Sequence, residues 1–163
     1  AQFILEPSVS ALERQQTMKL LGSRFPVNLY TGSNTKGLPV INGGTVKTLT
    51  EMPLIFHYSK INLNITSKSI RSGLPLRIFD ILGCGGFLLT NYQPELSNYF
   101  TPGYDLVCYS SEDELLEKTE YYLSHEKERI EIAQNGLQTV TQYHNYPERL
   151  LQIISMAYGI TKG

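Results

Sequence analysis

Short apolar runs alternate along this chain with stretches that repeat at the helical period. The runs that we expect to form strands are 27–31, 61–65, 87–90 and 106–109, and residues 3–5 are a candidate for a further short strand. These runs lack a regular polar alternation, which is typical of parallel strands covered on both faces. We therefore predict an α/β fold, with a Rossmann-like parallel sheet, helices on both of its faces and further helices at the C-terminus.

The remaining segments predict helices, and two of them carry a recognisable start. The expected ranges are 10–25, 45–59, 74–84, 94–100, 111–124, 126–144 and 146–159. Ser10 and Ser111 each stand three residues before a glutamate, which is the capping-box spacing of a helix N-terminus. In the helix 126–144 the expected buried stripe consists of Ile130, Ala133, Leu137 and Val140.

The composition argues against several classes of protein. The 163 residues suit one domain, and a formal net charge of −1 gives no electrostatic argument for a nucleic-acid or membrane partner. No apolar run approaches the roughly 20 residues of a membrane span, and the N-terminus lacks the features of a signal peptide. Cys84 and Cys108 lie in apolar surroundings without metal-ligand spacing, so we expect buried free thiols and a cytoplasmic protein.

Two glycine clusters flank the apolar helix expected at 74–84. In parallel sheets, ligands bind outside the carboxyl ends of the strands, where helix N-termini offer free N–H groups and a positive dipole. The cluster Gly83–Gly86 follows a helix and precedes a strand, so we assign it to the opposite edge and interpret it as a helix stop. It is not a G-x-G-x-x-G fingerprint, because it follows no strand and opens no helix.

The second cluster, Ser72–Arg77, follows a strand and opens a helix, which puts it at the ligand edge. Gly73 would let the backbone approach a ligand closely, and the amides of Leu74, Leu76 and Arg77 would face the crevice. Two interpretations remain open here. One is an anion-binding loop, and the other is an ordinary loop before a helix that starts with proline.

Arg77 and Asp80 interrupt the otherwise apolar helix, and their spacing of three puts them on one face near its first turn. One interpretation is a local ion pair. In the other, Arg77 faces a phosphate and Asp80 accepts hydrogen bonds from two sugar hydroxyls, because a carboxylate accepts such bonds and donates none.

The histidines and serines give no support for a metal or hydrolase site. His57, His125 and His144 lie on different expected elements, with His125 at a helix start and His144 at a helix junction. No G-x-S-x-G elbow is present, so Ser/His/Asp catalysis is not supported.

Several of these segments together resemble one family. The stretch "GLPLRIFDILGCGGFLLTN" and the segments after it are similar to the C-terminal domain of group 1 glycosyltransferases, one half of a GT-B enzyme. The branch that they resemble most is the bacterial one grouped with the spore maturation protein CgeB. The matching motifs are Lys60–Leu63, Arg77–Asp80, Cys84–Gly86 and His144–Arg149, within a resemblance that runs from about Leu12 to Arg149.

The resemblance implies an enzyme of two domains. The C-terminal domain binds a nucleoside diphosphate sugar, the N-terminal domain binds the acceptor, and transfer occurs between them. Residues 1–163, which begin without Met, would be a single donor-binding domain from a longer glycosyltransferase, and inactive in transfer by itself.

The resemblance also implies roles for individual residues. Asp80 stands where related enzymes have a glutamate that binds the nucleotide ribose, and Ser72 stands where many have a second glutamate. Gly73–Leu76 matches the loop whose amides bind the donor phosphates. Helix dipoles and a cation, for which Arg77 is our candidate, would stabilise the leaving group, and no metal or other cofactor is expected.

Three hypotheses remain: the donor domain of a glycosyltransferase, a non-catalytic nucleotide- or partner-binding module on the same fold, and an unrelated doubly wound protein of the flavodoxin-like kind. Protection from thermal unfolding by a nucleoside diphosphate would favour the first.

Overall fold

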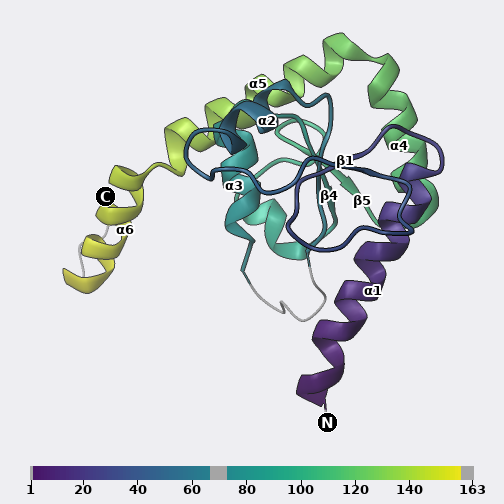
Figure 1. The fold of residues 1–163 in the computed structure, drawn as a ribbon. Coiled ribbons are helices and arrows are strands. Elements are labelled where there is room, and N and C mark those ends of the chain that lie inside the picture. Colours follow the sequence, from purple (N-terminus) through teal and green to yellow (C-terminus); the bar gives the residue numbers. More distant parts are fainter. Residues whose placement is uncertain (1, 67–72, 159–163) are drawn as a thin grey trace.

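The computed structural model describes residues 2–66 and 73–158, and a small parallel sheet lies at its centre (Figure 1). The strands β3 (Asn62–Asn64), β4 (Leu88–Asn91) and β5 (Val107–Tyr109) pair in parallel in that order. A separate parallel pair is formed by β1 (Asn28–Leu29) and β2 (Ile41–Asn42).

Helices surround this sheet. Their bounds are Gln2–Gly22 for α1, Met52–Tyr58 for α2, Leu76–Gly83 for α3, Pro94–Asn98 for the 3-10 helix η1, Glu112–Ser124 for α4, Glu126–Tyr143 for α5 and Tyr146–Tyr158 for α6. Helix α5 runs across the top of Figure 1 from α4 to α6, and α1 and α6 extend from the body on different sides. None of the helices within the described ranges is long and apolar enough to cross a membrane.

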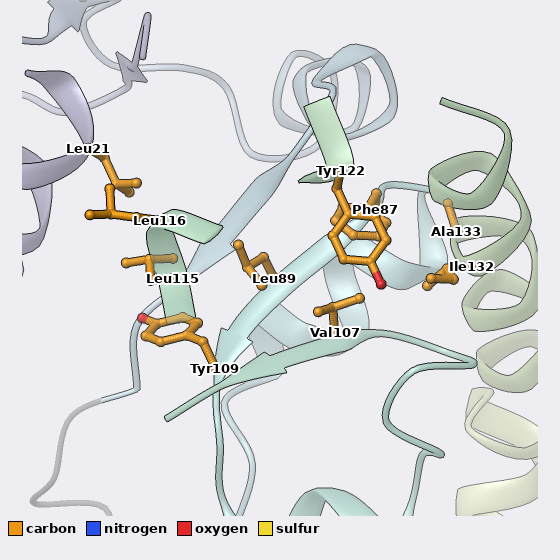
Figure 2. Close-up of a cluster of buried hydrophobic side chains, with 10 residues drawn as sticks. All are labelled: Leu21, Phe87, Leu89, Val107, Tyr109, Leu115, Leu116, Tyr122, Ile132 and Ala133. Carbon is orange, nitrogen blue, oxygen red and sulfur yellow. The ribbon is translucent and has the colours of Figure 1, made fainter. Parts of the chain in front are cut away.

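Both faces of the three-stranded sheet are buried. Leu89 and Val107 stand opposite each other and point to one face, where they pack with residues of α4 and with Leu21 near the end of α1 (Figure 2). Leu88 and Cys108 point to the other face and pack with residues of α3 and η1. This double burial explains the largely apolar character of β4 and β5. The predicted α/β fold, with parallel strands and helices on both sides, is confirmed.

Helix α3 ends in the glycine cluster that we interpreted as a helix stop. Gly85 has a φ of +70°, a conformation that side chains rarely tolerate, and the Gly86 N–H donates to the Ile81 carbonyl at 3.0 Å. This is the hydrogen bond of a Schellman motif. A Cβ atom on Gly86 would lie 2.6 Å from the Phe56 carbonyl oxygen and 2.7 Å from Asn62 Nδ2. The cluster therefore ends α3 and lets the start of β4 approach its neighbours closely.

The N-terminal part departs from the expected elements. Residues 3–5 lie inside α1 rather than in a strand, and Ser10 lies within that helix rather than at its cap. A helix satisfies its own backbone hydrogen bonds, whereas a strand needs a neighbour, and this explains why a helix replaces the isolated strand. The strand expected at 27–31 is reduced to β1, whose partner β2 lies in a segment expected to be a loop. The helix expected at 45–59 is reduced to α2, because Pro53 is tolerated only in a first turn.

The buried face of α5 also differs from the expected stripe. Arg129, Ala133 and Gly136 are buried, whereas Ile130 and Leu137 are 47% and 37% exposed. A Cβ atom on Gly136 would lie 2.4 Å from a backbone carbonyl oxygen in the turn before β5. The helix therefore packs through a close backbone approach that an apolar stripe does not reveal.

Helix α4 begins as its sequence predicts. Ser111 Oγ accepts a hydrogen bond from the Glu114 N–H at 3.1 Å, and Glu114 Oε2 accepts one from the Ser110 N–H at 2.7 Å. The hydrogen bond and ion pair with Lys118, followed by the hydrogen bond from the Ser110 N–H, hold the pKa of the Glu114 carboxyl below its ordinary value. The first turn of α4 is thus closed by its own side chains.

Lys118 also binds the edge of the sheet. Its ammonium group donates to the Cys108 carbonyl of β5. The adjacent carbonyl, that of Tyr109, accepts from the Tyr92 N–H on the β4 side at 2.8 Å, so the Cys108 carbonyl faces the outer side of β5. Lys118 therefore satisfies an acceptor that an edge strand would otherwise expose.

Candidate functional site

Helices α3 and α4 both begin at the edge where the strands β3, β4 and β5 have their carboxyl ends, because each follows a strand and runs back along the sheet. The start of α4 is closed by Ser111 and Glu114. Helix α3 follows Pro75, which has no N–H, and no side chain of the described residues caps it. The first amides of α3, those of Leu76 and Arg77, therefore form an open start of an α-helix at this edge.

The loop before α3 keeps its backbone open to solvent. Gly73 is exposed with a φ of +86°, and a Cβ atom there would have none of the described residues within 4 Å. Leu74 packs partly against the buried side chains of α3 and η1, whereas the side chain of Leu76 is 78% exposed. The positive φ explains the glycine, and the open space beside it leaves room for a ligand. Ser72, the remaining expected member of this loop, lies outside the described residues.

The Arg77 side chain turns toward α2 rather than toward Asp80. Its Cζ lies 5.4 Å from the centre of the Phe56 ring, and Nη1 donates to Met52 Sδ at 3.1 Å. Within the described residues no hydrogen bond or ion pair joins Arg77 to Asp80, so the interpretation as a local ion pair is wrong. The guanidinium connects α3 to α2 through a cation–π contact. Its role at a phosphate stays a prediction.

Asp80 lies on the face of α3 that looks away from the sheet. Ile78, Ile81 and Leu82 are buried beneath the helix, and Asp80 is exposed. Burial raises the pKa of the Cys84 thiol one turn later, and the Asp80 charge raises it further. Asp80 is thus a solvent-facing acceptor on the same short helix whose first amides are open.

A network of polar side chains, which the sequence reasoning missed, ties together the carboxyl ends of β3 and β4. Asn64 Nδ2 donates to the hydroxyl oxygens of Thr66 and Thr90, each at 3.0 Å. Asn91 Oδ1 accepts from the Thr66 N–H at 2.7 Å, and Asn91 Nδ2 donates to the Thr66 carbonyl at 3.2 Å. Asn64, Thr66 and Thr90 are all buried. The network fixes the start of the loop that leads toward Gly73.

Gln93 adds a further buried polar group at this edge, two residues after β4. It is 9% exposed, and its Oε1 has no hydrogen-bond partner in the part of the chain that the structure describes. A signal for these residues was present in "INLNIT" and "LLTNYQ", where amide and hydroxyl side chains interrupt or end apolar runs. Buried polar groups in strands need partners, so such interruptions indicate a network.

The chain is similar to a known family and to several solved structures. A family described as glycosyl transferase-like matches residues 2–155. HepE of Anabaena, in a complex with UDP-glucose, superimposes with a TM-score of 0.69 at 13% identity, over 90% of this chain and 45% of that one. The same protein with UDP and glucose gives 0.68 at 12% identity, over 88% and 44%.

A further solved structure is the C-terminal domain of a group 1 glycosyl transferase, LpcC, from Francisella tularensis. Its TM-score is 0.54 at 18% identity, over 68% of this chain and 56% of that one. No curated protein matches the chain. The chain spans about half the length of the solved structures that it matches. Sequence identities of 12–18% support a common fold alone. Because the family match extends over nearly the whole sequence, the chain belongs to the glycosyl transferase-like family.

Proposed function

We propose that this chain is the donor-binding domain of a cytoplasmic glycosyltransferase of the CgeB-like branch. In this proposal the enzyme moves a sugar from a nucleoside diphosphate sugar to an acceptor held by a second domain. Membership of the glycosyl transferase-like family supports the reaction class. The coverage of 45% of the HepE chain is consistent with a further domain, and the free cysteines are consistent with a reducing compartment.

The observation that carries the proposal is the open N-terminus of α3 with an exposed carboxylate on the same helix. The amides of Leu76 and Arg77 have no side-chain cap from the described residues, and a Cβ atom on Gly73, three residues before Leu76, would meet none of the described residues within 4 Å. An anionic diphosphate is stabilised at such a position by N–H donors and by the helix dipole. Asp80 would then accept hydrogen bonds from two ribose hydroxyls.

The proposed chemistry is departure of a nucleoside diphosphate from the transferred sugar. Negative charge develops on the diphosphate as the sugar bond breaks, and donors fixed beforehand at the start of α3 would stabilise it. Arg77 has donors beyond the one that binds Met52, so it is our candidate for a further contact to this charge. The proposal requires no metal or other cofactor, because the amides, the dipole and a cation supply the stabilisation.

The proposal is tested by thermal unfolding with UDP, GDP and UDP-glucose. A ligand that binds only the folded chain at a hundred times its dissociation constant should stabilise it by about 2.7 kcal/mol. We expect one of these compounds to raise Tm. We expect Asp80→Ala to weaken binding by about 1.5–3 kcal/mol, the usual contribution of a hydrogen bond to a charged group.

Glu131→Ala is the matched control, because it removes an exposed carboxylate from α5. It should leave the ligand-induced shift unchanged. The absence of a shift with all three compounds would contradict donor binding. An equal loss in Asp80→Ala and Glu131→Ala would contradict the role of Asp80.

A further inference from the structure

A hollow lies at the opposite end of the sheet, away from the start of α3. Its volume is 290 Å³, and it is bordered by the end of α2, the residues before β3, the turn between α3 and β4, and the first turns of α5. Its wall includes His57, Lys60 and Arg129 together with the apolar side chains of Phe87, Ile130 and Ala133. Because these residues precede the strands rather than follow them, the hollow is separate from the candidate donor site.

Arg129 is the residue of this hollow whose charge most needs compensation by a ligand. Its side chain is 7% exposed, and Nη1 donates to the Tyr122 carbonyl at 2.7 Å. Its ion-pair partner, Glu126, lies 3.4 Å from Nη2, and the Glu126 side chain is 71% exposed. A buried guanidinium requires close compensation of its charge, and a solvated carboxylate at that distance supplies little of it. The charge of Arg129 is therefore only partly balanced.

The charges of the wall are mostly positive. Lys60 adds a second cation, and among the described residues that line the hollow Glu126 is the sole carboxylate. The His57 ring is held by a 2.9 Å hydrogen bond from Nδ1 to the Cys84 carbonyl, so it forms a fixed side of the wall. Phe87 and Ala133 are buried and give the hollow an apolar side. The hollow thus has a cationic side, formed by Arg129 and Lys60, next to an apolar side.

We propose that this hollow binds a small organic carboxylate. The carboxylate group would lie against Arg129 and Lys60, and the apolar part of the molecule would lie against Phe87, Ile130 and Ala133. Guanidinium groups match the planar carboxylate with paired hydrogen bonds. A volume of 290 Å³ lies just below the usual range of ligand pockets, about 300–1,000 Å³, and suits a single small ring with its acid group.

The test uses benzoate as the probe and benzamide as its neutral counterpart. Amide shifts of the isotope-labelled chain are followed by NMR during titration. We expect benzoate to shift amides around Lys60, Gly85 and Ile130 in a saturable manner, and benzamide to bind at least about tenfold more weakly because it lacks the charge. Saturating UDP should leave benzoate binding unchanged, so failure of this site and failure of donor binding are distinguishable.

Lys60→Gln is the main variant, because Lys60 is exposed and its replacement leaves the core intact. It should weaken benzoate binding about three- to fivefold, the scale of a partly exposed charge pair. Lys127→Gln is the control, since Lys127 is an exposed lysine of α5 outside the wall, and it should have no effect.

Three results would overturn the proposal. The first is binding of benzamide as tight as that of benzoate. The second is an equal loss of benzoate binding in Lys127→Gln and Lys60→Gln. The third is inorganic phosphate shifting the same amides as strongly as benzoate, which would indicate a general anion site rather than one for organic carboxylates.

Discussion

Gly83 and Gly86 stand three residues apart, yet their surroundings differ. A Cβ atom on Gly86 would lie 2.6 Å from a backbone oxygen, whereas one on Gly83 would find its nearest neighbour, Val140 Cγ1, at 3.7 Å. We expect Gly86→Ala to lower the free energy of unfolding by about 1–3 kcal/mol through overpacking. Gly83→Ala should be neutral or raise it by up to about 1 kcal/mol, because Gly83 is the last residue of α3 and alanine favours helix. Urea unfolding of both variants checks the pair, and equal losses would contradict the packing described at β4.

The buried thiol of Cys108 lowers the free energy of unfolding at alkaline pH. Burial raises the pKa of its thiol from 9.0 to about 11, the nearby Lys118 opposes this rise, and Glu114 adds to it. Burial also raises the pKa of the Tyr109 hydroxyl to about 12. The folded chain keeps these protons at pH values where the unfolded chain releases them. The stabilisation is therefore complete below about pH 9 and is lost as the pH rises through the folded pKa values.

The measurement is urea unfolding at intervals between about pH 8 and pH 11. We expect the free energy of unfolding of the wild type to fall across this range. Cys108→Ala should start from a lower stability, because a core side chain is shortened, and should lose less as the pH rises. The same slope in both chains would show that the thiol does not carry the effect.

At the scale of elements, Asn91 holds the ends of β3 and β4 together. It both accepts from the Thr66 N–H and donates to the Thr66 carbonyl. Asn91→Ala leaves these part-buried groups without their partner, so we expect a loss of about 1–3 kcal/mol in the free energy of unfolding. Because the loop toward Gly73 starts at this point, the affinity for the nucleotide that binds best should fall as well. Asn98→Ala is the control, since Asn98 is exposed at the end of η1. A loss of stability without a loss of affinity would show that the Asn91 network does not support nucleotide binding.

Much of the central sheet could be predicted from the sequence, and physical reasons explain the parts that could not. The strands β3 and β5 fall within the expected runs, and β4 extends one residue beyond its run. In β4 and β5, burial on both faces leaves a largely apolar signal. The predicted buried stripe of α5 was wrong at Ile130 and Leu137, because the helix approaches its neighbour through Gly136, which makes its contact without a side chain. Strand β2 was missed because a two-residue strand carries no periodicity.

The candidate site was predictable where it depends on backbone and less so where it depends on side chains. The order of strand, loop and helix was enough to indicate an open start of α3. Pro75, the residue before this helix, has no N–H. The direction of Arg77 was not predictable, because it depends on Phe56 of α2, which is distant in sequence. Asn64 and Asn91 were missed for the same reason, since their partners lie across strands.

At the scale of the whole molecule, the proposed function assigns residues 1–163 to donor binding and the acceptor to a second domain, so under that proposal these residues hold only part of the reaction centre. We predict that this polypeptide alone transfers no sugar from UDP-glucose or GDP-mannose, although it binds a nucleotide. Under the proposed function the acceptor is held by another domain, so these residues alone do not hold the two reactants together, and the gain in rate from their proximity is lost. The measurement is the release of UDP or GDP over several hours, monitored by chromatography. Turnover above that of a boiled sample would contradict the prediction.

Lys118 on the outer carbonyl of β5 has a consequence for how the molecule behaves in concentrated solution. A second chain could extend the sheet at this edge only by displacing the ammonium group from the Cys108 carbonyl and separating it from Glu114. Fibril growth by strand addition uses such unpaired edges, and a lysine on the edge opposes it. One side chain thus protects a short sheet from templated aggregation where other proteins cover the edge with an additional helix or loop.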